Sequence, residues 1–116
     1  MQIKKVVVIG SGTMGSGIAA HLCNANIPVT LLDLKTEISE QARDKIYKSK
    51  PPLLLDKSKI NNIKVGNIND NFEIVKDADW VVEAVVERID IKHDIYEKIF
   101  KERKKGAIVS SNTSSI

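Results

Sequence analysis

The chain has 116 residues, of which 42% are hydrophobic and 28% are charged. These proportions are those of an ordinary globular domain, and the length allows one hydrophobic core but excludes two catalytic domains. The formal net charge of +3 and the aromatic content of 4% argue against a protein that binds nucleic acid through base stacking. We therefore expect one globular domain, spanning residues 1–116, that binds no nucleic acid.

Cysteine content and hydropathy bear on the compartment. The sequence contains one cysteine, Cys23, which has no partner for an internal disulfide and is typical of a reducing environment. No segment reaches the roughly 20 apolar residues that a membrane-spanning helix needs, and residues 1–5 lead into a strand-like run rather than a signal peptide. These features predict a cytoplasmic protein without membrane contact.

Strands and helices alternate along the first half of the chain. Residues 6–9 form an uninterrupted β-branched run, which is typical of a parallel strand buried on both faces. Apolar residues at helical spacing predict a helix over residues 14–24, and a second apolar run predicts a strand over 29–32. Apolar residues four positions apart predict a second helix over 38–46, which the prolines at 51 and 52 end.

The second half continues the alternation after a less regular segment. Residues 53–71 contain only a weak strand pattern at 63–65. A strong apolar run predicts a strand over 80–86, a helical stripe follows over 91–99, and a last strand is expected over 107–110. Strands that alternate with helices over short connections predict a parallel sheet of about five strands, doubly wound, with helices on both faces.

A glycine motif lies between the first strand and the first helix. The residues Gly10, Gly12 and Gly15 match G-x-G-x-x-G in the strand-turn-helix context of a Rossmann-type dinucleotide-binding fold. The first glycine permits a tight turn, the second lets the backbone approach a pyrophosphate, and the third allows close helix packing. We expect the loop, including Thr13 and Met14, to bind the phosphates; a glycine-rich turn without a ligand is the alternative.

Asp33 indicates which dinucleotide binds. It follows the second strand, about 20 residues beyond the glycines, where a carboxylate accepts hydrogen bonds from the adenosine ribose. Because a carboxylate would repel a 2′-phosphate, Asp33 predicts NAD rather than NADP, although the nearby Lys35 could weaken this preference. The alternative for Asp33 is a helix N-cap or turn residue.

Three segments together resemble one enzyme family. They are residues 7–19 around the glycine loop, residues 79–87 (DWVVEAVVE) and residues 110–115 (SSNTSS). In this order they resemble the 3-hydroxyacyl-CoA dehydrogenases of fatty-acid β-oxidation. Residues 79–92 are especially similar to bacterial polypeptides that fuse this dehydrogenase to an enoyl-CoA hydratase.

The resemblance implies roles for the matching residues. Met14 and Asp33 would contact the dinucleotide. Ser114 would lie between the nicotinamide and the oxygen at C3 of the substrate, as a hydrogen-bond partner rather than a nucleophile. The remaining residues implied on the nicotinamide side of the cofactor are Val85, Val86, Glu87, Lys92 and Asn112. For each polar residue the alternative is a solvated charge or a turn residue.

The chain also departs from the family pattern. In the family a histidine beyond the Asn-Thr-Ser-Ser segment is the general base, and a helical C-terminal domain completes the acyl-CoA pocket and the dimer. Neither matches any part of residues 1–116, so we expect an incomplete domain and assign no CoA contacts within residues 45–60. An apolar face and a strand edge left uncovered would favour self-association.

Two alternatives to this function stay open. A dehydrogenase of another small β-hydroxyacid could carry a similar glycine loop, and a module or gene fragment could bind NAD without turnover. We predict no metal site, because no His, Cys or Asp cluster has the spacing of metal ligands.

Overall fold

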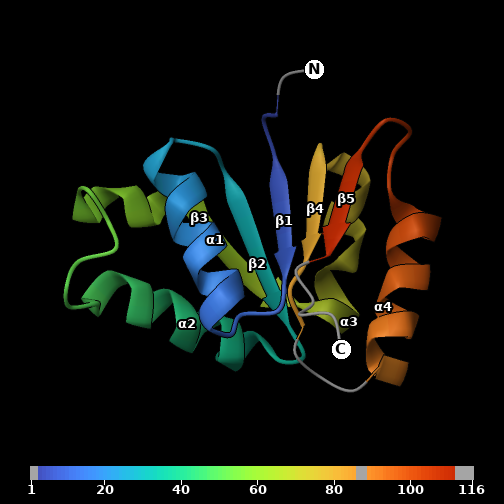
Figure 1. Ribbon diagram of the computed structural model, residues 1–116, viewed down its shortest axis with the longest axis horizontal. Coiled ribbons are helices and arrows are strands. Elements are labelled where there is room, and N and C mark those ends of the chain that lie inside the picture. Colours follow the sequence, from blue (N-terminus) through green and yellow to red (C-terminus); the bar gives the residue numbers. More distant parts are fainter. Residues whose placement is uncertain (1–2, 86–88, 112–116) are drawn as a thin grey trace.

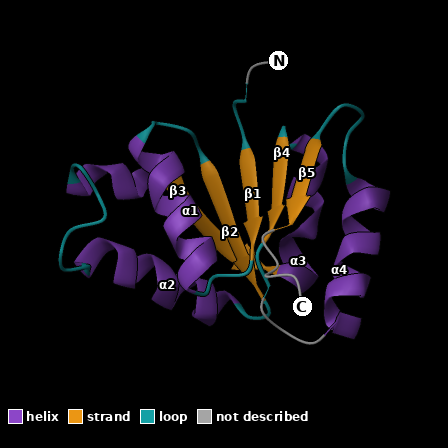
Figure 2. Cartoon of the chain, in the orientation of Figure 1, coloured by secondary structure: helices purple, strands orange, loops and turns teal. Residues whose placement is uncertain are grey.

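A five-stranded parallel sheet forms the centre of the molecule (Figures 1 and 2). The structure is a computed structural model that describes residues 3–85 and 89–111. The strands are β1 (Val6–Ile9), β2 (Val29–Asp33), β3 (Ile63–Asn67), β4 (Trp80–Glu83) and β5 (Ile108–Ser111), in the spatial order β3-β2-β1-β4-β5. From β1 the chain builds outward first to one side and then to the other, which is the doubly wound α/β topology predicted from the sequence.

Helices cover both faces of this sheet. On one face α1 (Thr13–Asn24), α2 (Thr36–Lys48) and the 3-10 helix η1 (Lys57–Asn62) pack against the strands. On the other face lie the elements α3 (Ile68–Asn71), η2 (Phe72–Asp77, a 3-10 helix) and α4 (Ile89–Glu102). Figure 1 shows α1 and α2 on one side of the sheet and α4 on the other.

The first strand shows how the sequence produces two cores. Side chains alternate between the two faces of a strand, so Val6 and Val8 join one apolar cluster while Val7 and Ile9 join the other. All four are at most 2% exposed. A run without polar residues is therefore required at the central strand, where both faces are covered.

One sequence prediction needs correction. The strand expected over residues 80–86 ends at Glu83, because the amide of Val85 donates to the Glu83 side chain at 2.6 Å instead of to a neighbouring strand. The strand predicted from the weak pattern at residues 63–65 is confirmed as β3, which pairs with β2 and extends to Asn67. The short helices η1, α3 and η2 lie in and after the segment that showed little pattern.

None of the helices in the described part of the chain has the length and apolar character needed to cross a membrane.

Candidate functional site

The glycine loop joins the carboxyl end of β1 to the start of α1, at the lower end of the sheet in Figure 1. Gly10 has a φ of +106°, and a Cβ there would lie 2.7 Å from the backbone of Ala84. A Cβ on Gly15 would lie 1.8 Å from the carbonyl oxygen of Gly10. Both positions therefore require glycine, because backbone atoms occupy the space of any side chain.

Gly12 lacks a side chain for a different reason. Its φ of −70° is open to any residue, and a Cβ there would meet nothing within 4 Å. The space beside it belongs to a cleft of about 250 Å³, lined by the loop, by Asp33 and by the residues that follow β4. A missing side chain next to open space provides room for a ligand group to approach the backbone.

The start of α1 is suited to an anion. Gly12 is its N-cap residue, no described side chain caps it, and its first turn contains no acidic residue. The first N–H groups of a helix have no partner within the helix, and the helix dipole gives this end partial positive charge. A phosphate group facing the cleft would satisfy these donors.

Asp33 holds the loop in place. Its Oδ2 accepts hydrogen bonds from the backbone N–H of Ser11 at 2.8 Å and from the Ser11 hydroxyl at 2.5 Å. Ser16 adds a second tie, because its hydroxyl donates to the Ser11 carbonyl oxygen at 2.9 Å. The carboxylate at the end of β2 thus fixes the loop after β1, and the sequence prediction did not include Ser11 in this role.

Asp33 also retains capacity for a ligand. A carboxylate accepts about four hydrogen bonds, and within the described residues Asp33 accepts two from Ser11 and one from the Leu34 amide. It does not cap a helix, since α2 begins at Thr36 with Lys35 as its N-cap residue. The half-buried carboxylate borders the same cleft as Gly12. These residues fit the adenosine and pyrophosphate of a dinucleotide.

A second carboxylate, Glu83, lies at the end of β4 and is fully buried. Its Oε2 accepts from the Val85 amide at 2.6 Å and pairs with the Lys92 ammonium at 3.2 Å. Its Oε1 accepts from the Ser111 hydroxyl at 3.0 Å. The side chain therefore links the ends of β4 and β5 to the first turn of α4.

The structure brings part of the predicted site together. Gly10, Gly12, Asp33 and Val85 line one cleft. Thr13 and Met14 occupy the exposed first turn of α1, and Lys92 lies in the first turn of α4. The other predicted residues fall outside the described part of the chain: Val86, Glu87, Asn112 and Ser114.

Glu83 and Ser111 were missed by the sequence prediction. One signal was available for Glu83: it is the acidic residue inside the otherwise apolar run of residues 80–86, and a carboxylate buried there needs partners. No such signal existed for Ser111, because its pairing opposite Glu83 depends on the register between β4 and β5.

Comparison with known proteins identifies the family. The sequence model described as "3-hydroxyacyl-CoA dehydrogenase, NAD binding domain" matches residues 5–116. The chain belongs to this family. NAD is accordingly the dinucleotide for which the glycine loop and Asp33 are suited.

Individual relatives agree with the family and are longer than this chain. A Deinococcus radiodurans protein named "Probable 3-hydroxyacyl-CoA dehydrogenase" is 44% identical over 123 residues, which cover 100% of this chain and 36% of that protein. An Arabidopsis thaliana peroxisomal fatty acid beta-oxidation multifunctional protein is 38% identical, covering 98% of this chain and 16% of its own length. The chain thus spans about a third or less of these relatives.

Solved structures show the same architecture. The crystal structure of 3-hydroxybutyryl-CoA dehydrogenase from Escherichia coli K12 superimposes with a TM-score of 0.84 at 27% identity. The match covers 100% of this chain and 26% of that structure. The fold, the family and the NAD cofactor predicted from the sequence are confirmed by these comparisons.

Proposed function

We propose that this chain forms the cofactor-binding part of an enzyme that oxidises (S)-3-hydroxyacyl-CoA to 3-ketoacyl-CoA in fatty-acid β-oxidation. The observation that carries the proposal is the contact between Ser11 and Asp33, which sets the glycine loop and the ribose-binding carboxylate around one cleft. This cleft lies beyond the carboxyl ends of β1, β2 and β4, where doubly wound folds bind their ligands.

The residues of the proposed site have different roles in cofactor binding. The backbone at Gly12, Thr13 and Met14 binds the pyrophosphate, with Gly10 and Gly15 shaping the turn. Asp33 accepts hydrogen bonds from the adenosine ribose, and its negative charge disfavours the 2′-phosphate of NADP. Val85 and Lys92 lie towards the nicotinamide side, and family similarity adds Val86, Glu87 and Asn112 there.

Bound NAD supplies the hydride acceptor, and the protein supplies binding and orientation. We propose that Ser114 hydrogen-bonds the oxygen at C3 of the substrate and forms no covalent bond. By family similarity, a histidine removes the hydroxyl proton of the substrate. That histidine belongs to a motif that residues 1–116 do not contain. Loss of a general base costs about 10²- to 10⁴-fold in rate, so this chain alone should bind NAD with little turnover.

Calorimetry with the purified chain tests the cofactor site. We expect tighter binding of NADH than of NADPH, and a smaller difference in Asp33→Asn, which removes the charge that repels a 2′-phosphate. Asp44→Asn, which neutralises an exposed carboxylate on α2, is the matched control and should behave as wild type. Equal or tighter binding of NADPH by the wild-type chain would contradict the proposal.

A turnover assay tests whether the chain alone is an active enzyme or only binds the cofactor. Acetoacetyl-CoA and NADH are mixed with the chain, and NADH oxidation is followed by absorbance. Binding of NADH without oxidation supports a cofactor-binding part that needs further residues for catalysis. Oxidation at an ordinary dehydrogenase rate would instead show that residues 1–116 contain a sufficient base.

Three wider expectations belong to the same proposal. Residues 1–116 act as one folding unit, and the chain works in the cytoplasm, as its single cysteine suggests. Self-association is supported by β5, which is the last strand of the sheet among the described residues and carries the half-exposed apolar side chain of Ile108 (47%). Acyl-CoA is the substrate partner of the whole enzyme.

A further inference from the structure

The carboxylate of Glu83, the last residue of β4, is fully buried. Its side chain has no exposed surface, and moving a carboxylate out of water costs several kcal/mol unless partners offset the loss. Val85, Lys92 and Ser111 are such partners, at 2.6–3.2 Å. A hydrophobic residue would fill the same space at lower cost if stability alone were required.

The carboxylate of Glu83 compensates for the unfavourable position of the Lys92 ammonium. Lys92 lies in the first turn of α4, where the helix dipole disfavours a positive charge. Its side chain is nevertheless only 12% exposed, and its ammonium is held 3.2 Å from Glu83 Oε2. The charge of Glu83 favours this buried position of the ammonium, because it offsets part of the cost of removing the ammonium from water.

The partners of Glu83 come from the three segments that lead to the predicted nicotinamide contacts. Val85 follows β4, Lys92 lies in the first turn of α4, and Ser111 immediately precedes Asn112 in the sequence. The register of the sheet sets Glu83 opposite both Ile9, at the base of the glycine loop, and Ser111. One carboxylate thus joins the elements on which the nicotinamide half of the site depends.

We propose that Glu83 is a positioning residue for the nicotinamide end of the NAD site and acts by holding the Lys92 ammonium at the mouth of β4. This inference rests on the proposed function, because it takes Lys92 as a cofactor contact. Glu83 itself touches no cofactor atom. Its removal should therefore affect ligands that reach Lys92 and leave ligands of the adenosine end unaffected.

NADH and ADP distinguish an effect on the nicotinamide end of the site from an effect on the adenosine end. NADH reaches both ends of the site, whereas ADP carries only the adenosine and pyrophosphate groups that Asp33 and Gly12 serve. Affinities of the full chain for both are measured by calorimetry, well below the lowest unfolding midpoint found by circular dichroism. The variants are Glu83→Gln, Lys92→Met and the double variant.

We expect Lys92→Met to weaken NADH binding about tenfold, the loss of one charge-assisted hydrogen bond. Glu83→Gln should also weaken NADH binding, by up to the same factor, because a neutral amide oxygen holds the buried ammonium less firmly than a carboxylate does. In the double variant the loss should equal that of Lys92→Met alone. ADP should bind all of these variants as it binds wild type.

Several results would overturn the inference. Glu83→Gln could lower the unfolding midpoint yet bind NADH as wild type does, which would make the network purely structural. The two single losses could multiply in the double variant, which would show that the residues act independently. Weakening of ADP to the same degree as NADH, or an unchanged NADH affinity in Lys92→Met, would also contradict it.

A second variant covers failure of Glu83→Gln to fold. Glu83→Asp keeps the negative charge but withdraws it from Lys92 by one methylene, so NADH binding should weaken while ADP binding does not. Wild-type NADH affinity in Glu83→Asp would then refute the inference. The control pair is Lys76→Met and Glu102→Gln, which break an ion pair on the outer surface of η2 and α4 and should change neither affinity.

The outcomes also separate this inference from the proposed function. If wild type does not bind NADH, the proposed function fails. If wild type binds NADH and the variants of Glu83 bind it equally well, only the inference fails.

Discussion

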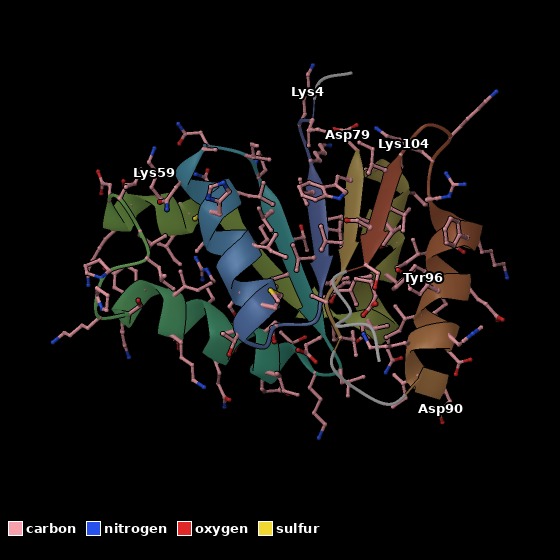
Figure 3. All side chains as sticks on the ribbon, viewed as in Figure 1. Lys4, Lys59, Asp79, Asp90, Tyr96 and Lys104 are labelled. Atoms are coloured by element: carbon pink, nitrogen blue, oxygen red, sulfur yellow. The ribbon has the colours of Figure 1, made fainter. Side chains whose placement is uncertain are left out.

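Two carboxylates at opposite ends of β4 bind similar partners and have different consequences. Asp79, just before the strand, accepts from the backbone amides of Lys4 and Lys5 at 2.8 and 3.0 Å and pairs with the Lys104 ammonium. Figure 3 shows Lys4, Asp79 and Lys104 together at the end of the sheet where the N-terminal residues enter. Glu83, at the other end, also combines a backbone amide with a lysine.

The two ends differ in burial and in what lies beside them. The side chain of Asp79 is 16% exposed and that of Glu83 is not exposed at all. Asp79 connects the residues just before β1 to the start of β4, at the amino ends of the parallel strands. Glu83 lies at the carboxyl ends, where ligands of doubly wound sheets bind. The same type of contact therefore serves stability at one end of the strand and is available for function at the other.

The largest effect should come from close packing at the carboxyl end. Gly15→Ala would place a Cβ 1.8 Å from the Gly10 carbonyl oxygen, and since both groups are backbone-anchored, α1 must move away from the loop. We expect a loss of about 3 kcal/mol or more in the free energy of unfolding, measured by urea denaturation.

Gly17→Ala is the control for that change. It lies in the same helix, and its Cβ would meet nothing within 4 Å. Alanine should stabilise the chain by about 0.5–1 kcal/mol through its higher helix propensity. Equal stability of Gly15→Ala and wild type would contradict the close contact between α1 and the loop.

Gly12→Ala should separate binding from stability at the same end. Because its backbone is unstrained and its Cβ would point into open space, the stability should change by less than about 1 kcal/mol. The methyl group would occupy the space of the pyrophosphate, so NADH affinity should fall at least about tenfold, or 1.4 kcal/mol. Wild-type affinity in calorimetry would remove Gly12 from the binding site.

Asp79→Asn, at the amino end of β4, should lower the stability and leave NADH binding unchanged. The variant loses the ion pair with Lys104, and we expect a lower urea midpoint at pH 7 with unchanged NADH affinity. A change in NADH affinity without a change in midpoint would reverse the contrast between the two ends.

The pH dependence of stability sharpens this prediction. The hydrogen bond from Lys104, assisted by the amides of Lys4 and Lys5, lowers the pKa of Asp79 from 3.8 to about 2. Because the folded state binds this proton less readily than the unfolded state, the stabilisation is complete above the ordinary pKa and is lost as the pH falls towards 2. The midpoint of wild type should therefore fall more over this range than that of Asp79→Asn.

The smallest effect is expected at the sheet edge rather than at the strand ends. Ile108 is 47% exposed on β5, which has a neighbour strand only in β4 among the described strands. We expect dimers or larger assemblies in light scattering at high protein concentration, and fewer of them in Ile108→Lys. Leu55→Lys changes a more exposed apolar residue away from the sheet and is the control. A monomer at all concentrations would contradict self-association.

The sequence predicted the parts of the fold that depend on neighbouring residues. Uninterrupted β-branched runs and helical spacing placed the main strands and helices, and the glycine spacing indicated the turn after β1. The short helices before β4 could not be predicted, because they have no repeated apolar pattern, whereas the strand between them was predicted from a weak one. The end of β4 was placed too late because Val85 is apolar, while the loss of its ladder bond arises from the side chain of Glu83.

What the sequence by itself determined is the order of elements and the residues of the glycine loop, since steric limits and side-chain periodicity act over short distances along the chain. Only the tertiary structure decided which polar groups meet. Ser11 reaches Asp33 across 22 positions, and Ser111 reaches Glu83 across 28. These pairs exist because the strand order and register bring the ends of separate strands to one edge of the sheet, which no local pattern encodes.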